Sequence, residues 1–263
     1  MSFQNPLIAK WQAGEPTLGG WVTTPEPAIA EYLASVGFDE VCADQQHSTL
    51  DVETLGAMFA AIEARGSVPT TRVAVNDYTL IGKSLDLGAL AVIVPMVNNR
   101  AEAERAVSAF RYPPRGTRSA GPLRAMWSMG SDPVDLDKAA CVLMIETKDG
   151  LANLDEIAST PGVDALYVGP GDLALGLGMS WDSSRWSPSE AEAHASAIER
   201  IRRAAVRNGI APGIHVGDGA TSARYIEQGF QMLTVASDLG LITVFGAPEL
   251  ALARAAVPPG RRR

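Results

Sequence analysis

Eight short apolar runs recur along the chain, and longer segments with helical spacing separate them. Several of the runs are continuously apolar rather than alternating, which is typical of strands buried on both faces of a parallel sheet. They predict strands at Leu18–Val22, Glu40–Asp44, Thr70–Val73, Ala91–Pro95, Val142–Glu146, Ala165–Val168, Ala211–His215 and Met232–Ala236.

The segments between these runs predict helices, because most place apolar residues at helical spacing and most end in glycine. They read PAIAEYLASVG, LGAMFAAIEARG, LIGKSLDLG, AEAERAVSAFR, LDEIASTPG, AEAHASAIERIRRAAVRNG and SARYIEQG. Eight β–α units indicate an α/β fold, a (β/α)8 barrel, with a doubly wound open sheet as the alternative. The glycine-rich dinucleotide fingerprint of that alternative is absent after the first strand.

We expect residues 1–263 to form a single barrel domain, because α/β barrels routinely use about 250 residues. The basic tail at Pro258–Arg263 is predicted to be frayed. The stretch Asn98–Ala140 is longer than a usual connection and is rich in Pro, Gly and Arg. It indicates a lid or a subunit contact at the catalytic end of the barrel, or else a plain surface loop.

Composition narrows the classes of partner. The chain has 22 Lys and Arg against 30 Asp and Glu, a net charge of −8, which argues against a nucleic-acid or anionic-membrane surface. No apolar run approaches the roughly 20 residues that span a bilayer, and the N-terminus lacks the pattern of a signal peptide. Cys42 and Cys141 are far apart and are predicted to be buried free thiols. We therefore expect a cytoplasmic protein.

In a barrel, chemistry is built where the strands end. The polar residues at the predicted strand ends are Asp44, His47, Arg72, Glu146, Asp172 and His215. They come from distant parts of the chain, and a barrel brings them to one face.

Glu146 and Asp172 follow consecutive strands, so their carboxylates can reach one point. Two carboxylates with waters and a chelating substrate suit a hard divalent ion such as Mg²⁺ or Mn²⁺. The alternative is structural, with Glu146 capping a helix or pairing with Lys148 and Asp172 serving as a helix N-cap.

His47 is a candidate general base, and a structural histidine is the alternative. Of the two other histidines, His194 falls in a polar mid-helix stretch and is predicted to be solvated, whereas His215 is a secondary site candidate. Arg72 requires an anionic partner if it is buried, which is either a substrate oxygen or an internal Asp.

At these residues the chain resembles the metal-dependent pyruvate aldolases of the HpcH/HpaI family, the 4-hydroxy-2-oxoheptanedioate aldolases. The resemblance covers nearly the whole chain, and its most specific blocks are GFDEVCADQQH, VIVPMVNNRAEAERAVSAFRYPPRGTR and IETKDGLANLDEIASTPGVDALYVGPGDLALGLG. It implies a TIM barrel of the phosphoenolpyruvate/pyruvate type whose last helix is exchanged between subunits, in a homohexamer. It also implies a divalent ion, Mg²⁺ or Mn²⁺ with Co²⁺ as an alternative.

Carried over by position, Glu146 and Asp172 resemble the metal ligands and His47 the general base. Arg72 resembles the residue that steadies negative charge on the substrate oxygen. Asp86 resembles the acid that raises the basicity of the histidine, with Asp44 as a structural alternative for that role. Gly171 and Asp172 match positions that contact the pyruvate carboxylate through backbone N–H groups.

Three positions depart from the family pattern. Gln46 stands where the family commonly has Glu, Met144 where it has Gln, and Ser119 where a Gly is usual. None removes a ligand or a base, so the departures bear on the aldehyde and on the natural substrate.

The activity that follows is reversible cleavage of a 4-hydroxy-2-oxo acid to pyruvate, or a hydroxypyruvate-like 2-oxo acid, and an aldehyde. A Schiff-base aldolase is a rival, but of the four lysines only Lys148 lies near the site. Two further rivals are a citrate-lyase-like enzyme that acts on a coenzyme A thioester and a catalytically silent barrel that binds 2-oxo acids.

Overall fold

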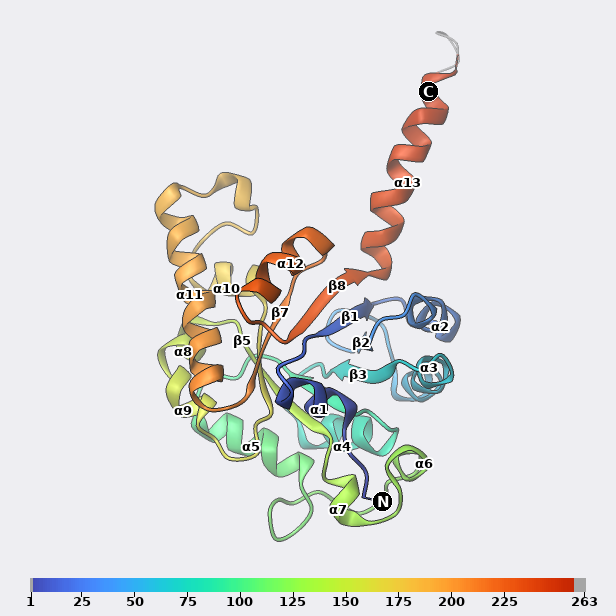
Figure 1. Cartoon of the computed structure of the whole chain (residues 1–263), viewed down its shortest axis with the longest axis vertical. Coiled ribbons are helices and arrows are strands. Elements are labelled where there is room, and N and C mark those ends of the chain that lie inside the picture. The colour runs from blue at the N-terminus through green and yellow to red at the C-terminus, as the bar shows by residue number, and fades with distance from the viewer. Residues whose placement is uncertain (1, 258–263) are drawn as a thin grey trace.

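The computed structural model describes residues 2–257, and within them eight parallel strands close into a barrel in the order β1 to β8 (Figure 1). Each strand pairs with the next, and β8 pairs with β1. All eight predicted strands are present, with ends within two residues of the prediction, so the (β/α)8 barrel is confirmed. The strands are β1 (Thr17–Val22), β2 (Glu40–Asp44), β3 (Val68–Arg72), β4 (Ala91–Val94), β5 (Ala140–Ile145), β6 (Ala165–Val168), β7 (Ala211–His215) and β8 (Met232–Ser237).

Helices surround the barrel, and the seven predicted helical segments all contain one. Most helices begin at a side chain that accepts backbone N–H groups of the first turn; α11 starts with a full capping box between Ser187 and Glu190. The α-helices are α1 (Pro6–Gln12), α2 (Pro27–Ser35), α3 (Val52–Ala64), α4 (Tyr78–Asp86), α5 (Arg100–Phe110), α6 (Ala125–Met129), α7 (Pro133–Leu136), α8 (Lys148–Ala152), α9 (Leu154–Ala158), α10 (Pro170–Gly176), α11 (Pro188–Arg207), α12 (Gly219–Glu227) and α13 (Asp238–Ala255).

Alternate strand residues divide between two apolar layers. On β2, Val41 and Ala43 belong to the layer between strands and helices, whereas Cys42 belongs to the layer inside the barrel. Because side chains alternate along a strand, Glu40 and Asp44 share the inward face with Cys42. The last inward residue of a strand therefore lies at the mouth of the barrel. Cys42 and Cys141 are both buried free thiols, as predicted.

The end of the barrel at which the strands begin, the N-terminal end, is closed by α1. Leu7 and Trp11 of this helix are buried against the inner layer. Asn5 caps the helix and also donates to the carbonyl oxygens of Leu90 (2.7 Å) and Lys138 (2.9 Å). These contacts seal this end with backbone and apolar groups.

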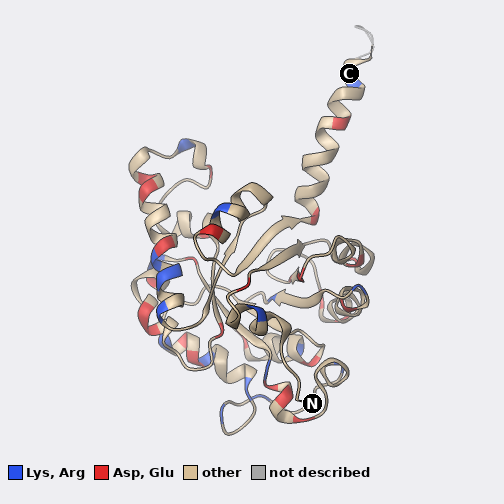
Figure 2. Cartoon of the chain, viewed as in Figure 1, with Lys and Arg blue, Asp and Glu red and all other residues tan. Residues whose placement is uncertain are grey.

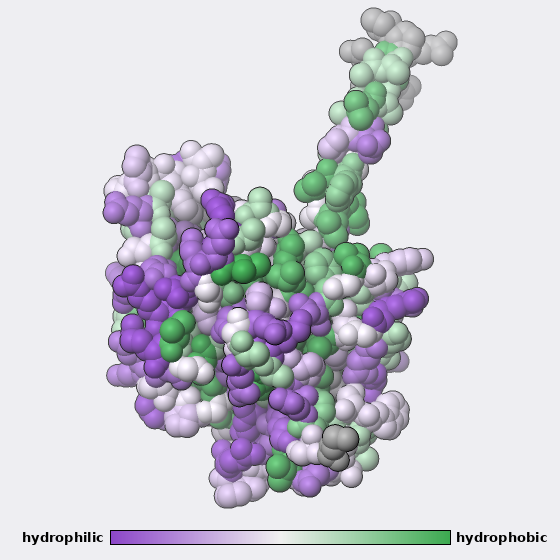
Figure 3. Space-filling model, viewed as in Figure 1, coloured by the Kyte–Doolittle hydropathy of each residue, from purple (hydrophilic) through white to green (hydrophobic). Residues whose placement is uncertain are grey.

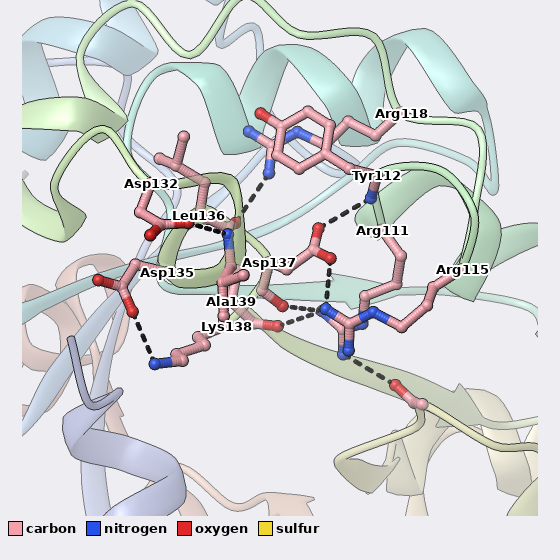
Figure 4. A network of polar contacts seen from close by, with 12 residues as sticks. Arg111, Tyr112, Arg115, Arg118, Asp132, Asp135, Leu136, Asp137, Lys138 and Ala139 are labelled. Carbon is pink, nitrogen blue, oxygen red and sulfur yellow. Dashed lines mark hydrogen bonds and ion pairs between the residues drawn. The ribbon is translucent and has the colours of Figure 1, made fainter. Parts of the chain in front are cut away.

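Most of the long stretch Asn98–Ala140, the part after α5, does not lie at the catalytic end, so its interpretation as a lid there is wrong. After α5 the chain has already crossed to the N-terminal end, and residues 111–139 with α6 and α7 lie there beside the N-terminus (Figure 1). Arg111 donates to the carbonyl oxygens of Asp137 (2.7 Å), Ala139 (2.9 Å) and Gly162 (3.0 Å), within the polar network of Figure 4. The extra residues of this connection therefore pack against the N-terminal end of the barrel and do not form a lid over the catalytic end.

Helix α13 projects away from the barrel after β8 (Figure 1). Figure 2 shows few charges along it, and Figure 3 shows apolar surface over much of its length. Its exposed large apolar residues are Leu239, Ile242, Val244, Phe245, Leu250 and Leu252. In the described part of the chain, no helix is both long and apolar enough to cross a membrane. The predicted frayed tail at Pro258–Arg263 lies outside the described residues.

Candidate active site

A cavity of about 500 Å³ opens at the C-terminal end of the barrel, where the strands end. Every strand except β4 contributes to its wall, either directly or through the segment that follows it. The lining residues are Trp21, Thr23, Asp44, His47, Arg72, Met144, Gly169, Pro170, Gly171, Asp172, Trp181, His215, Ser237 and Leu239. The sequence-predicted residues His47, Arg72, Gly171 and Asp172 meet here.

Arg72 and Asp44 form a buried, two-pronged ion pair in the wall. Nε of Arg72 donates to Oδ1 of Asp44 at 3.0 Å, and Nη2 donates to Oδ2 at 2.6 Å. Burial alone would raise the pKa of Asp44, but the hydrogen bonds and charge of Arg72 hold that pKa below its ordinary value. The guanidinium also lies 4.9 Å from the ring centroid of Trp21. Of the two partners left open by the sequence, the internal Asp is therefore present, and Nη1 of Arg72 has no hydrogen bond to the described residues.

The carboxylates of Glu146 and Asp172 face each other. Glu146 is buried, and burial together with the nearby Asp172 raises its pKa to about 7. The backbone N–H of Met96 donates to Glu146 Oε1 at 2.8 Å and opposes that rise. Met96 adopts φ 58°, a left-handed conformation that is uncommon outside glycine and that clusters at functional sites.

Two glycines let the chain after β6 approach these groups closely. A Cβ on Gly169 would lie 2.4 Å from Met144 Cε and 2.9 Å from Glu146 Oε2. A Cβ on Gly171 would lie 2.7 Å from the Trp181 ring. Any side chain at either position would push the wall apart. The segment from Gly169 to Gly171 is thus packed tightly against its neighbours.

The two histidines of the cavity differ in setting. His47 is exposed at the rim and has no hydrogen bond to the described residues. His215, at the end of β7, is half-buried, and its ring packs edge-on against Trp21 with centroids 4.8 Å apart. Burial and the Arg72 guanidinium lower the pKa of His215 to about 4, although the charge of Asp44 opposes this shift.

The interpretation of Asp86 is not supported within one chain. Asp86 is the last residue of α4, which returns to the N-terminal end of the barrel before β4 begins. Its carboxylate accepts from Arg118 Nη2 at 3.0 Å, and it does not line the cavity. The sequence does not show where Asp86 lies, because the end of α4 is at the opposite end of the barrel from the cavity. Asp44 is the structural alternative for this role. Its carboxylate accepts hydrogen bonds from Arg72, Trp21 and the backbone N–H of Gln46, and none from His47.

The prediction that His194 is solvated is wrong. This histidine is buried on α11, and its Nε2 lies 2.8 Å from the carbonyl oxygen of Pro170. Its ring packs against Trp186 with centroids 4.7 Å apart. Both partners come from outside the helix, so its polar helical neighbours gave no sign of them. His194 supports the segment that carries Gly171 and Asp172.

The structure also adds site residues that the sequence did not single out. Trp21 is the next-to-last residue of β1 and contacts Arg72, Asp44 and His215. Its place as the last inward residue of a strand was the signal that could have revealed it. Met96 and Trp181 carried no such signal, because their roles depend on a backbone conformation and on a loop contact.

The comparisons with known proteins show the family of this chain. The family model for HpcH/HpaI aldolase/citrate lyase matches residues 17–243. The chain belongs to the HpcH/HpaI aldolase/citrate lyase family. It is 41% identical over 253 residues to a hydroxypyruvate/pyruvate aldolase of Rhizorhabdus wittichii, covering 95% of this chain and 99% of the relative.

Other relatives place the chain in the same HpcH/HpaI family. A 4-hydroxy-2-oxo-heptane-1,7-dioate aldolase of Salmonella paratyphi A is 36% identical, covering 91% of this chain and 90% of the relative. The crystal structure of an HpcH/HpaI aldolase/citrate lyase family protein from Burkholderia cenocepacia superposes with a TM-score of 0.85 at 30% identity. That match covers 97% of this chain and 100% of the other.

Proposed function

We propose that this family member is a class II aldolase, a carbon–carbon lyase that reversibly cleaves 4-hydroxy-2-oxo acids to pyruvate or a hydroxypyruvate-like acid and an aldehyde. The observation that carries the proposal is the meeting of three functions in one cavity. Asp172, Arg72 with a spare donor and the rim histidine His47 line it, and Glu146 lies beside Asp172. The relatives named as aldolases support it.

The carboxylate pair suits a hard divalent cation. Glu146 and Asp172 would hold Mg²⁺ or Mn²⁺, with Co²⁺ as an alternative, because oxygen ligands with open positions for water and substrate match these ions. Among residues 2–257 no cluster of three or more His, Cys, Asp and Glu side chains could hold a metal, so substrate and water would complete the shell. Such an ion, when bound, supplies Lewis acidity to the 2-oxo group.

The chain's own residues position the substrate. Gly171 and Asp172 lie in the first turn of α10, where backbone N–H groups lack intrahelical acceptors, and these groups bind the pyruvate carboxylate. Arg72 Nη1 donates to the 2-oxo oxygen. Asp44 and Trp21 fix the guanidinium so that no reorganisation is needed when charge develops there.

His47 handles the proton. In cleavage it takes the proton from the 4-hydroxyl oxygen while the bond between C3 and C4 breaks, and the bonding electrons move toward the 2-oxo oxygen facing Arg72. The resulting enolate then takes up a proton at C3 to give the 2-oxo acid. In synthesis the same proton returns to the new hydroxyl. None of the four lysines lines the cavity, and Lys148 is exposed, which argues against a Schiff base.

The exposed apolar face of α13 supports the expected assembly. Asp238, its first residue, accepts from the backbone N–H groups of Thr23 and Thr24, and Leu239 reaches the cavity wall, so the helix starts at the site and then leaves the barrel. A helix with this much exposed apolar surface needs a partner. In the proposed homohexamer the helix packs on a neighbouring copy. Light scattering should give a mass of six chains, and a monomer would overturn this assembly.

Incubation with pyruvate and a panel of aldehydes tests the activity. Product should form with Mn²⁺ or Mg²⁺ and disappear with EDTA. Borohydride added with pyruvate should leave the enzyme active. Activity that persists in EDTA and is destroyed by borohydride would replace the metal mechanism with a Schiff base.

A further inference from the structure

His215 is a cavity residue for which the proposed cleavage has no use. It ends β7, and its register partner is Thr234 on β8. Its wall position lies between the Gly169–Asp172 segment after β6 and the Ser237–Leu239 segment after β8. The proton of the 4-hydroxyl goes to His47 and the oxygen charge goes to Arg72, so His215 is available for another task.

The ring of His215 packs against a neighbouring side chain but forms no hydrogen bond with the described residues. Trp21 contacts it edge-on, with the centroids 4.8 Å apart, and the same indole lies 4.9 Å from the Arg72 guanidinium. Trp21 thus fixes the imidazole and the guanidinium side by side. Neither ring nitrogen of His215 forms a hydrogen bond with the described residues. The imidazole therefore presents polar atoms to the cavity, close to the place where the 2-oxo group is bound.

The charge state of the ring limits what it can bind. Burial and the Arg72 guanidinium lower its pKa to about 4, so the imidazole is neutral at neutral pH. A neutral imidazole has one donor and one acceptor, which matches a hydroxyl group and gives no special attraction for a second carboxylate.

Two other polar side chains nearby already have protein partners. Both oxygens of Asp44 bond to Arg72, and Ser237 Oγ accepts the backbone N–H of Gly240 at 3.1 Å. Met144 contributes a buried thioether to the floor. His215 differs from them, because neither its donor nor its acceptor has a hydrogen-bond partner among the described residues.

We propose that His215 is a specificity residue that hydrogen-bonds a hydroxyl carried by the substrate beside its reacting carbons, so that the enzyme favours hydroxylated substrates. This inference rests on the proposed aldolase function. The hydroxyl belongs either to the 2-oxo acid, as in hydroxypyruvate against pyruvate, or to the aldehyde, as in glycolaldehyde against acetaldehyde. The two sources are separated by the experiment.

The test compares kcat/KM ratios in wild type and two variants. His215→Phe keeps an aromatic ring against Trp21 but removes both hydrogen-bonding atoms, whereas His215→Gln keeps a donor and an acceptor. One arm measures hydroxypyruvate against pyruvate at fixed acetaldehyde, and the other measures glycolaldehyde against acetaldehyde at fixed pyruvate. In one arm the preference for the hydroxylated substrate should fall about 5- to 10-fold in His215→Phe, the value of one neutral hydrogen bond. His215→Gln should keep most of that preference.

Leu239→Val is the matched control, because Leu239 lines the same cavity without a polar group, and its ratios should stay within twofold of wild type. Calorimetric titration of hydroxypyruvate and of pyruvate in the presence of Mg²⁺ gives a binding ratio that does not require turnover. Ratios unchanged by His215→Phe in both arms and in calorimetry would overturn the inference while leaving the aldolase intact. Wild type that turns over neither 2-oxo acid would instead defeat the proposed function, and the calorimetric ratio would then decide the role of His215.

Discussion

The two ends of the barrel use the same residue types in opposite ways. At the N-terminal end, Arg111 donates to three carbonyl oxygens and to Asp164 Oδ2 at 3.1 Å (Figure 4). At the C-terminal end, Arg72 forms side-chain hydrogen bonds only to Asp44 among the described residues, and its Nη1 is left unbonded beside a cavity of about 500 Å³. Both arginines are buried.

The contrast shows how structure and function separate in one fold. A buried polar group that finds all its partners holds elements together, whereas one held in place with bonding capacity left over is available to a ligand. Glu146 makes the same point, because its pKa of about 7 reflects burial and a neighbouring carboxylate that the protein does not neutralise. Variants at the C-terminal end should therefore lose activity, whereas variants at the N-terminal end should lose stability.

Loss of a carboxylate at the C-terminal end should have the largest effect. Glu146→Ala or Asp172→Ala should abolish metal-dependent turnover, because two protein carboxylates leave no spare ligand. Calorimetry with Mn²⁺ measures the lost affinity, and circular dichroism checks that the barrel is intact. Unchanged Mn²⁺ affinity in both variants would refute these residues as ligands.

The second largest effect on turnover is expected for His47→Ala. It should slow aldol cleavage about 10²- to 10⁴-fold, the usual range for a general base, and leave Mn²⁺ affinity unchanged. Steady-state kinetics at neutral pH gives the answer. A near-normal rate would make His47 a rim residue without a role in proton transfer.

Arg72→Lys should reduce kcat at least ~10²-fold, comparable to losing one oxyanion donor. Lysine keeps the charge but cannot grip Asp44 with two donors while presenting a third to the substrate. The dissociation constant of oxalate, a non-reactive pyruvate analogue, should change much less. If oxalate affinity collapses and kcat at saturation stays normal, Arg72 is a carboxylate clamp instead.

Arg111→Lys is the matched control for this variant at the other end. It removes donors from four buried or half-buried acceptors, so it should lower the free energy of unfolding by about 2–4 kcal/mol and leave kcat within twofold. Urea unfolding at fixed protein concentration measures the loss. If Arg111→Lys lowered kcat as much as Arg72→Lys does, the proposed division between a structural N-terminal end and a functional C-terminal end would be wrong.

Glu40, the first residue of β2, gives a pH-dependent test that sharpens the comparison. Its Oε2 is buried without a partner, and burial followed by the charge of Asp39 raises its pKa to about 8 from 4.5. Between these values the folded state keeps a proton that the unfolded state has lost, so this group's contribution to stability falls as pH rises. Glu40→Gln should therefore gain about 4 kcal/mol of stability relative to wild type between pH 5 and pH 8.5. Parallel stability curves across that range would contradict this account of Glu40.

Local pattern was enough for the framework of this fold. The strands, most helices and the residues at strand ends follow from apolar periodicity, because each β–α unit repeats the same burial. Asp44, Arg72, Glu146 and His215 are all inward-facing or end residues of such strands, so barrel geometry brings them together without further information.

The errors share one physical cause, which is dependence on contacts between distant segments. The Asn98–Ala140 stretch was misplaced because nothing local shows that a helix has carried the chain back to the N-terminal end. His194 was misread because its partners, Pro170 and Trp186, lie outside its helix. The close approach of Gly169 to Met144 and Glu146 likewise arises only when two strands pair.

Exchange of the methyl hydrogens of pyruvate with D₂O, followed by proton NMR with Mg²⁺, is the most direct test of chemistry at the C-terminal end. It needs no knowledge of the natural aldehyde, because it reports the loss and return of a C3 proton alone. The account predicts exchange that requires the enzyme, stops with EDTA, disappears in Glu146→Ala and survives in Arg111→Lys. Exchange no faster than in buffer, or equally fast in Glu146→Ala, would contradict a metal-dependent aldolase site in this cavity.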